Sequence, residues 1–534
     1  MKDTYDAIVI GAGMGGLTCA AWLAGKGMSV AVVEQNIQPG GLCSSYRREG
    51  GFNFTPAASI ITGADMKDGI FERLAKSLGI ENAIEFIPLD QGYHVHFPDF
   101  DYKMYSGSDE ARKRFVEKVI SLFPQEKQGI TDFFATLEKI YDQSSYATFL
   151  GTGPKDVARI LRNCPTLLKH MGKGIMPFVS RFVSDPKLKA VLSINSTCAN
   201  LPPSKISVLA IAGLLIEGGK SNPHVVGGSQ AVSEAFASCV RDKGGEVLLG
   251  RLVDRILIEG SRAVGVETVT SPLAQERGGA PAGEQRETLR AKYIISNAAS
   301  RQTFHRLVGE KYVGRKFLSK LDAMEPTPPY CALFLGLDMD LRAQEFVPAL
   351  HIHTSTYDTD EQFRNVNAKL LDEAGPVPFF RFQFAPLSDP TSAPEGKTAF
   401  VLHSIPAPVL HWENPEWQKR ITELMIKRVE KVIPGISQHI EYQELATPQT
   451  MDRFTRCGPD ASIGWACTPR QIGPKRPSNK TPVDNLLLAG HWTAPAIGVM
   501  AAVISGLQAA RIVLKTEGVG EPLGDMGIED GLMV

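Results

Sequence analysis

The chain has 534 residues, of which 43% are hydrophobic and 22% charged, and its formal net charge at pH 7 is −1. This composition is ordinary for a globular protein, and the balanced charge gives no reason to expect a nucleic-acid partner. At about 150 residues per core, the length predicts two to four cores.

The cysteines and the first residues of the chain indicate in which cellular compartment the protein is expected. The eight cysteines show no CxxC pair and no zinc-binding spacing, so we expect free thiols in a reducing compartment and no metal site. Asp3 and Asp6 precede an apolar run that is too short for the apolar region of a signal peptide. We therefore expect a cytoplasmic protein.

The amino-terminal unit follows the pattern of a dinucleotide-binding fold. Tyr5–Ile10 reads as a buried strand, GAGMGG follows at once, and the next strand, Ser29–Val33, ends at Glu34. The glycines permit the tight turn, the approach of the backbone to a pyrophosphate and close helix–strand packing, and Glu34 is placed to accept hydrogen bonds from a ribose. The cofactor-binding residues expected here are Gly11, Gly13, Gly15, Gly16, Glu34 and Gln35.

The next stretch, QPGGLCSSYRREGGFNF, adds a second glycine pair, Gly40 and Gly41. Together with the first unit it resembles the extended fingerprint of the FAD-dependent flavoproteins related to amine oxidases, in particular phytoene desaturases, carotenoid isomerases and retinol saturases. The resemblance implies FAD as cofactor. It also implies that Leu42 lies at the cofactor, without the guanidinium contact that relatives with Arg at this position can make. It also implies a Rossmann-like, glutathione-reductase-like α/β FAD-binding domain with an interleaved α+β substrate (cap) domain.

Two returns to the FAD-binding domain are expected in the middle of the chain. HVVGGSQAVSEA leads into a helix, Ser229–Lys243, and two strands, Val247–Ile258 and Ala263–Val269, and AKYIISNAAS is a further strand ending near Asn297. The resemblance implies that Val253 and Asn297 lie against the cofactor; an inward strand residue is equally compatible with Val253. The segments predicted for each part are 1–84, 222–301 and 451–515 for the FAD-binding domain, 85–221 and 302–450 for the cap, and 516–534 for a loose acidic tail.

Residues 155–189 combine basic and large apolar residues. Eight Lys or Arg stand there against Asp156 and Asp185, with Leu161, Leu168 and Phe178 among the apolar residues. This mixture fits a helix lying in the surface of a bilayer, and equally an amphipathic helix packed in the cap. The first alternative would place the protein peripherally on the inner face of the membrane.

The stretch Leu486–Ala510 contains no charged residue and is long enough to span a bilayer. Pro495 and the glycines at 490, 498 and 506 argue against a single spanning helix and predict a strand, a turn and a helix from Val499. The layout resembles the carboxy-terminal flavin-binding segment of phytoene desaturases. This resemblance implies that Gly490, His491, Gly498, Val499 and Met500 bind the flavin.

The catalytic candidates are His491 as a proton donor or ribitol neighbour, Trp492 as a wall of the substrate channel or a core aromatic, and Arg453 as a flavin- or substrate-facing cation or a surface residue. The resemblance implies hydride transfer at flavin N5 that desaturates, saturates or isomerises carbon–carbon bonds of an apolar polyene or isoprenoid substrate such as a carotenoid. Because no second GxGxxG unit occurs, the electron partner is expected to be external: a quinone, oxygen, a carrier protein or NAD(P)H. An amine oxidase and a non-enzymatic prenyl-protein chaperone of the same fold are the alternatives.

Overall fold

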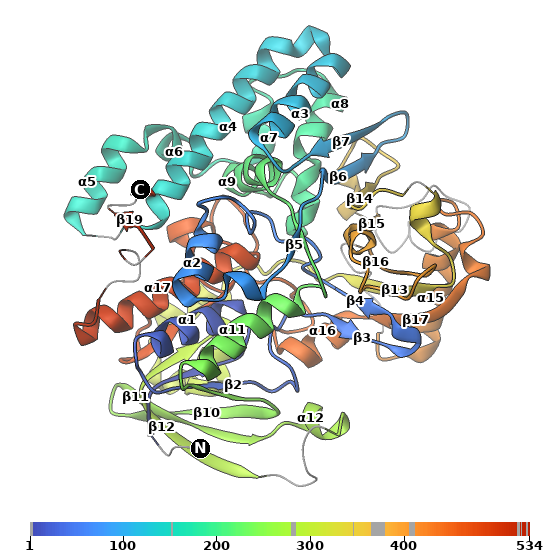
Figure 1. The fold of residues 1–534 in the computed structure, drawn as a ribbon. Coiled ribbons are helices and arrows are strands. Elements are labelled where there is room, and N and C mark those ends of the chain that lie inside the picture. The colour runs from blue at the N-terminus through green and yellow to red at the C-terminus, as the bar shows by residue number, and fades with distance from the viewer. Residues whose placement is uncertain are drawn as a thin grey trace.

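Two sheets organise the molecule, one at the base and one in the cap (Figure 1). The computed structural model describes residues 4–150, 153–278, 285–344, 346–364, 380–404, 412–520, 524, 526–529 and 532–533. Every segment predicted for the FAD-binding domain contributes strands to the base sheet, and both predicted cap segments contribute strands to the cap sheet.

The base sheet is built on parallel strands from three distant parts of the chain. In spatial order they are β9 (Glu246–Leu248), β2 (Val30–Val33), β1 (Thr4–Ile10), β12 (Arg286–Ser296) and β18 (Leu486–Leu488). The first half of β12 instead pairs with β11 (Arg262–Thr270), which pairs with β10 (Arg251–Glu259), both antiparallel. The near-continuous burial of β1, β2 and β18 is typical of strands covered on both faces.

Helices α1 (Met14–Gly25), α11 (Gln230–Asp242) and α17 (Val499–Glu517) cover one face of the base sheet. By length and composition, α17 alone among the described helices is apolar enough to cross a membrane, and half of its most apolar stretch is buried within the protein. It packs on α1 so closely that a Cβ at Gly506 would lie 2.1 Å from the Gly15 carbonyl oxygen. The absence of charge between Val499 and Ala510, the first part of this helix, is therefore accounted for by protein packing.

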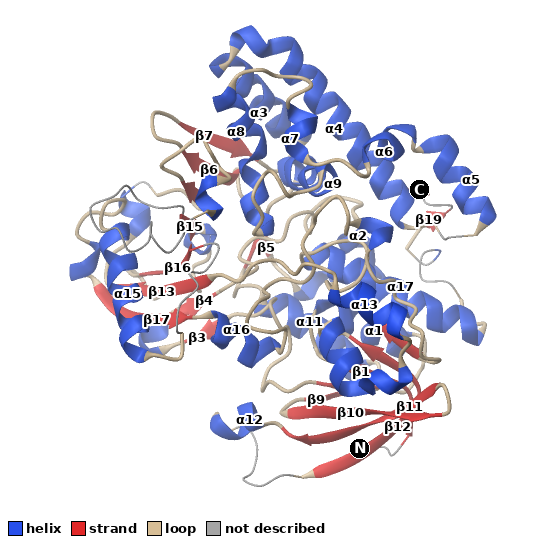
Figure 2. Ribbon diagram, turned by 180° about the vertical axis from the view of Figure 1, so that it is seen from behind, coloured by secondary structure: helices blue, strands red, loops and turns tan. Residues whose placement is uncertain are grey.

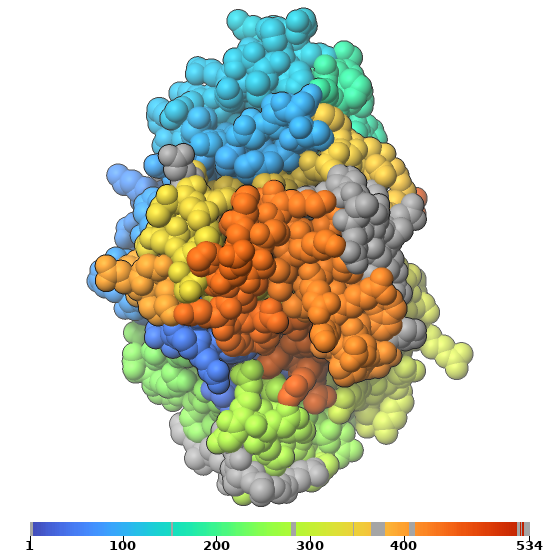
Figure 3. Space-filling view, turned by 90° about the vertical axis from the view of Figure 1, so that its right-hand side faces the viewer, coloured from blue at the N-terminus to red at the C-terminus, as the bar shows by residue number. Residues whose placement is uncertain are grey.

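The cap sheet joins the two insertions edge to edge. Its spatial order is β17 (Ile440–Ala446), β13 (Cys331–Leu337), β16 (Thr398–Ser404), β15 (Phe380–Gln383), β14 (Leu350–His353), β6 (Gln91–His96) and β7 (Asp101–Tyr105). Only β14 and β6 run parallel among these described pairs, and they are the seam between the insertions. Figure 3 looks onto the face formed by the second insertion, in yellow to orange below the helices of the first.

A layer of helices from the first insertion lies above the cap sheet (Figure 2). Its members are α3 (Asp109–Leu122), α4 (Lys127–Thr148), α5 (Pro154–Asn163), α6 (Pro165–His170), α7 (Ile175–Val179), α8 (Pro186–Ser193) and α9 (Val208–Ala212). Aromatic residues, among them Phe133 and Phe178 with ring centroids 5.6 Å apart, fill the core beneath it.

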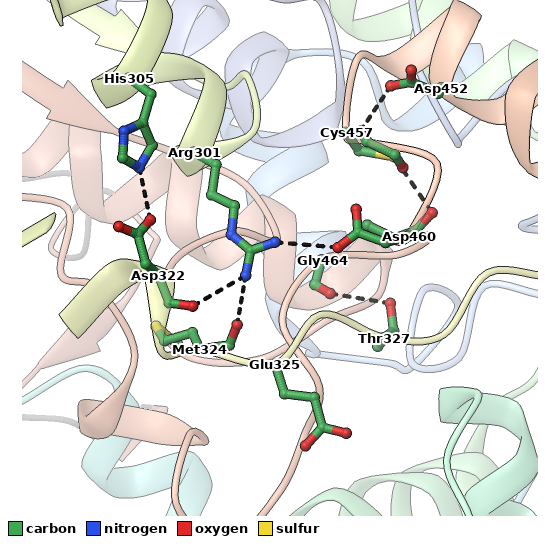
Figure 4. Close-up of polar contacts among 12 residues, drawn as sticks. Arg301, His305, Asp322, Met324, Glu325, Thr327, Asp452, Cys457, Asp460 and Gly464 are labelled. Atoms are coloured by element: carbon green, nitrogen blue, oxygen red, sulfur yellow. Dashed lines mark hydrogen bonds and ion pairs between the residues drawn. The ribbon is translucent and has the colours of Figure 1, made fainter. Parts of the chain in front are cut away.

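The boundary predicted at residue 302 is wrong, because the next two helices pack on the base sheet. Helices η6 (Gln302–Gly309) and α13 (Arg315–Asp322) bury Phe304 and Leu318 in the same core as β10 and β11. Polar contacts fix this segment to the loop before β18 (Figure 4): the Arg301 guanidinium pairs with Asp460 at 3.3 Å and donates to the Met324 carbonyl oxygen at 2.9 Å.

Two further boundaries differ from the prediction. Residues Phe52 and Phe54, placed in the first FAD-binding segment, pack in the cap core, where Phe54 stacks on Phe334 with centroids 5.4 Å apart. The tail is not loose throughout: α17 extends to Glu517, and Met526 is buried while its carbonyl accepts a hydrogen bond from Arg73 at 3.1 Å.

Candidate functional site: a cofactor cradle continuous with an apolar cavity

A single cavity of about 1820 Å³ runs from the glycine loop at the carboxyl ends of β1 and β2 into the cap. Almost all the predicted cofactor-binding residues line it: Gly11, Gly13, Gly15, Glu34, Gln35, Gly40, Gly41, Leu42, Val253, Asn297, Gly490, His491, Gly498, Val499 and Met500. Gly16 is not among the lining residues, since a Cβ there would lie 2.3 Å from the Gly11 carbonyl oxygen inside the strand–helix packing.

The glycine loop leaves no room for side chains. A Cβ at Gly13 would lie 2.7 Å from Asn297 Nδ2, and one at Gly15 would lie 2.5 Å from the Gly490 nitrogen. Asn297 thus sits between the first glycine loop and the turn after β18, and its backbone nitrogen donates to the Ile10 carbonyl oxygen at 2.8 Å. This packing brings the amino-terminal ends of α1 and α17 to the same cavity, where unpaired backbone N–H groups favour an anion.

Glu34 is buried at the tip of β2, with only 5% of its surface exposed. Its Oε2 accepts a hydrogen bond from the Ala12 backbone nitrogen at 2.7 Å, and its Oε1 accepts from the Asn36 backbone nitrogen at 2.8 Å. Burial raises the pKa of the carboxyl, and these hydrogen bonds oppose that effect. Glu34 therefore holds the glycine loop through the Ala12 nitrogen, and it lines the part of the cavity where a ribose would lie.

The second glycine pair lies directly against the first loop. Gly40 forms a bridge with Gly13 and donates from its backbone nitrogen to the Ala12 carbonyl oxygen at 2.7 Å. Gly40 and Gly41 have φ angles of 121° and 59°, which favour glycine. On the opposite wall Val253 continues the lining, with its side chain 5% exposed.

Arg453 does not belong to this site. Its guanidinium forms a surface ion pair with Glu276 of α12 (Pro272–Glu276), and both side chains are more than half exposed. Its near neighbour Arg456 does line the cavity, and Arg456 Nε donates to Gln35 Oε1 at 2.8 Å. Because helix α16 (Pro448–Thr455) ends between the two residues, their side chains leave in different directions.

His491 and Trp492 have different surroundings. The Trp492 ring is 4% exposed and packs edge-on against Trp465 with centroids 4.9 Å apart, so it is a core aromatic that also lines the cavity. Burial and the nearby Arg476 lower the pKa of His491 to about 4. The His491 ring is therefore neutral at pH 7, which argues against a cationic proton donor and favours the role of a neighbour of the cofactor.

No motif in the sequence singled out Arg476, a buried arginine that holds the loop carrying His491. Its Nη1 donates to the carbonyl oxygens of His491 and Thr493 at 3.1 and 3.2 Å, and its Nε donates to that of Gln471 at 3.1 Å. Arg476 is 3% exposed and lines the cavity. It therefore fixes the turn after β18 and places a positive charge beside the cofactor cradle.

Beyond the cradle the cavity wall is mostly apolar and comes from residues 60–66 and from the first insertion. The large apolar residues that line it there are Ile60, Ile61, Met66, Phe149, Leu150, Ile160, Leu161, Leu167, Leu168, Leu209 and Leu214. The second insertion adds a polar group to this wall, in which Arg381 Nη2 and Gln383 Nε2 each lie 3.2 Å from His403 Nδ1, with Tyr330 edge-on to the His403 ring. Sequence reasoning missed this group because no motif links residues 330–403; only the alternation of β15 hints that Arg381 and Gln383 share a face.

Glu217 is a second cavity residue that the sequence did not indicate. It ends η5 (Gly213–Glu217), a single π-helical turn, and π turns recur at functional sites. A Cβ at Gly63 would lie 2.3 Å from Glu217 Oε1, so the carboxyl is held tightly against backbone. Burial raises the pKa of Glu217 to about 7, against the opposing charge of Lys220. A carboxyl of this kind both gives and takes a proton near neutral pH.

The cradle fits FAD. Two glycine segments meet at one helix amino-terminus, a buried carboxylate lies at the tip of β2, and a second helix amino-terminus at Gly498 opens onto the same cavity. A cavity of about 1820 Å³ also exceeds the roughly 300–1,000 Å³ usual for one small ligand. There is room for a dinucleotide and a substrate together.

Comparison with known proteins agrees with this assignment. Residues 14–514 match the family of flavin-containing amine oxidoreductases. Among curated proteins, prolycopene isomerase 1 of an Oncidium hybrid is 26% identical, over 97% of this chain and 85% of its own length. A neurosporene-forming phytoene desaturase of Rhodobacter capsulatus is 24% identical, over 95% of this chain and 93% of its own.

The fold is also that of solved flavoproteins. Cyclohexylamine oxidase from Brevibacterium oxydans superposes with a TM-score of 0.57 at 17% identity, covering 96% of this chain and 99% of its own. The cofactor is FAD, and the protein is a flavoprotein oxidoreductase. With its glycine loops, Glu34 and the α17 amino-terminus around one cavity, the chain belongs to the family of flavin-containing amine oxidoreductases.

Proposed function

We propose that this flavoenzyme acts on carbon–carbon bonds of an apolar polyene or isoprenoid chain, which it desaturates, saturates or isomerises. The observation that carries the proposal is the continuity of the FAD cradle with a long, mostly apolar cavity in the cap. The named activities of the curated relatives, prolycopene isomerisation and phytoene desaturation, support it over amine oxidation. The intact flavin cradle likewise argues against a non-enzymatic prenyl-protein chaperone.

Bound in the cradle, FAD supplies hydride transfer at flavin N5. The chain's own residues hold the reactants and handle the proton. Backbone N–H groups at Gly498–Met500 and the Arg476 guanidinium favour negative charge at the cofactor. The apolar cavity wall of α4, α5 and α9 excludes water and orients the apolar substrate. Glu217, with a pKa near 7, is the proposed proton donor or acceptor of the cap.

The electron partner of a net oxidation or reduction is proposed to be external: a quinone, oxygen, a carrier protein or NAD(P)H. An isomerisation needs no net electron transfer. Flavin redox state and product analysis together therefore distinguish the three reactions.

The test mixes the oxidised and the reduced protein, without oxygen, with polyenes, isoprenoid quinones and amines, and follows flavin absorbance and chromatography of the products. A desaturase bleaches the oxidised flavin, a saturase reoxidises the reduced one, and an isomerase changes only the double-bond geometry. Flavin reduction by amines with no change in any polyene would overturn the proposal.

We further propose that the cavity mouth docks on the surface of a membrane, which would place the protein peripherally on the inner face. Three of the exposed large apolar residues of the chain, Val157, Leu161 and Leu168, lie on α5 and α6 and line the cavity, with exposed fractions of 43%, 63% and 36%. Exposed Lys155, Arg162 and Lys169 stand among them. Apolar side chains with lysine and arginine suit an anionic interface.

The rest of residues 155–189 does not contribute to this surface. Ile175, Phe178, Val179 and Val183 are buried in the cap core, so an ordinary amphipathic packing accounts for them. The proposed docking surface is therefore confined to α5 and α6.

Flotation with vesicles of phosphatidylglycerol or phosphatidylcholine tests the docking surface. We expect the wild type to float with the anionic vesicles. Val157→Ser with Leu161→Ser should weaken binding about 30-fold, since each of the two lost apolar contacts contributes on the order of 1 kcal/mol. Tyr312→Ser, which removes an exposed apolar side chain away from the cavity mouth, is the control. Equal binding by the double variant and the control would refute this surface.

A further inference from the structure

Four histidines form a ladder on one face of the seam between the two insertions. The alternation of β6 and β14 puts His94 and His96, and His351 and His353, on the same side of the cap sheet. The parallel register pairs His351 with His94 and His353 with His96. On the other side, Val95 and Ile352 pack in the cap core. The histidine ladder lies outside the cavity described above.

Three of these rings converge. Ring nitrogens of His94, His96 and His351, one from each, lie within 4.8 Å of one another. His96 Nε2 and His351 Nδ1 are 3.2 Å apart. Two nitrogens bound to one tetrahedral zinc at 2.0–2.1 Å lie about 3.3 Å apart, so this spacing already matches a pair of zinc ligands.

The remaining nitrogens have the partners that a metal-binding histidine needs. His94 Nε2 lies 2.6 Å from Asp101 Oδ2, and His351 Nε2 lies 2.9 Å from the Val347 carbonyl oxygen. Each contact places a proton on that nitrogen and leaves Nδ1 with its lone pair. Within the described part of the chain, His94 Nδ1 is buried and has no hydrogen-bond partner, which is costly without a ligand.

The charges around the ladder permit a cation. The His351 ring is 2% exposed, and a neutral imidazole is the form that binds metal. The groups facing the ladder from β7 are Asp101, opposite His96, and Lys103, opposite His94. The residues that face His351 and His353 from β15 and its flank are Phe380, Phe382 and Phe384, which carry no charge.

We propose that His94, His96 and His351 bind one Zn²⁺, with Asp101 orienting His94, and that the ion fastens the β6–β7 hairpin of the first insertion to β14 of the second. Imidazole ligands favour zinc or a neighbouring transition metal over calcium or magnesium. The fourth position is left to water or to His353, whose Nε2 also has no hydrogen-bond partner among the described residues. This inference does not depend on the proposed reaction.

The experiment uses the full FAD-loaded chain without a polyhistidine tag. After dialysis against a chelator, Zn²⁺ is titrated calorimetrically and bound metal is measured by elemental analysis. The variants are His351→Gln, Asp101→Asn and, as a matched control, His439→Gln, an exposed histidine on a distant edge of the cap. Flavin absorbance verifies that each variant is folded.

We expect about one zinc per chain in the wild type and in His439→Gln, and a rise in Tm with zinc concentration. His351→Gln should lose the site, and Asp101→Asn should weaken it about 10- to 100-fold, as loss of an orienting partner does elsewhere. Zinc binding with equal affinity in His351→Gln and the control, or no zinc binding by the wild type, would overturn the proposal. If His351→Gln does not retain FAD, Asp101→Asn decides by the same criterion.

Discussion

The FAD-binding domain and the cap differ in where their working residues lie along the chain. In the FAD-binding domain, Gly13, Gly15 and Glu34 lie within one strand–helix–strand unit, and a Cβ at Gly15 would meet backbone atoms at 2.5 Å. In the cap, Glu217 and Arg381 come from different insertions, and both line the cavity. Substitutions of the glycines in the FAD-binding domain should therefore disturb folding and FAD binding. Substitutions of the polar residues in the cap should change the reaction and leave FAD bound.

The largest effect is expected at Gly15. Gly15→Ala places a methyl group 2.5 Å from the Gly490 nitrogen and 2.8 Å from Asn297 Oδ1, and should cost about 3 kcal/mol and most of the bound FAD. Flavin absorbance of the purified protein and thermal unfolding measure this. Gly25→Ala, in the same helix but with nothing within 4 Å, should keep its FAD. Full flavin content in Gly15→Ala would show that the loop packing is looser than described.

The next largest effect is expected at Arg476, which holds the turn after β18 in the FAD-binding domain. Arg476→Met leaves the carbonyl oxygens of Gln471, His491 and Thr493 without their donor, and should destabilise the protein by about 2–3 kcal/mol and weaken FAD binding. Lys475→Gln, at the exposed neighbouring position, should change stability by less than about 0.5 kcal/mol. Chemical unfolding of both variants measures the difference, and equal stabilities would remove the structural role of Arg476.

Glu217 should show the opposite behaviour, a change in chemistry without loss of FAD. The pKa of Glu217 is about 7 in the folded protein, against an ordinary value of 4.5. The folded chain binds more protons between these values, so the carboxyl costs stability progressively as pH rises from about 4.5 to about 7, and in full above that. Glu217→Gln should therefore be more stable than the wild type by on the order of 1–3 kcal/mol at about pH 8, and no more stable at about pH 4.

The same variant should also lose any limb of the pH–rate profile near pH 7, while its flavin content stays unchanged. Glu117→Gln on the exposed face of α3 is the control for stability. A stability difference from the wild type that does not vary with pH would mean that Glu217 does not titrate as described.

The smallest effect is expected at Arg453. An ion pair between two side chains that are more than half exposed contributes about 0–1 kcal/mol, so Arg453→Ala should leave stability, FAD content and turnover nearly unchanged. Steady-state kinetics measure the effect on turnover. A large fall in kcat would show that Arg453 takes part in the reaction after all.

The sequence predicted most of the cradle and little of the cap. The glycine spacing and the acid after β2 determine structure within a few residues of the chain, so a single sequence is enough to recognise them. The turn with glycine and proline before α17 was also predicted correctly. The group around Arg381 and the histidine ladder depend on the pairing of strands from separate insertions, as with His96 and His351, 255 residues apart. Helices η6 and α13 were assigned to the cap because an amphipathic pattern does not reveal which sheet it covers.

Filling the cap part of the cavity tests most directly whether FAD and an apolar substrate share one cavity. Gly213 starts η5 and lines the cavity, and a Cβ there meets nothing within 4 Å, so Gly213→Phe adds a ring at the cavity wall while Gly213→Ala adds only a methyl group. Under anaerobic conditions, with the polyene that reacts best with the wild type, we expect Gly213→Ala to react normally. Gly213→Phe should bind FAD fully and react at least about 10-fold more slowly. An unchanged rate in Gly213→Phe would contradict the account.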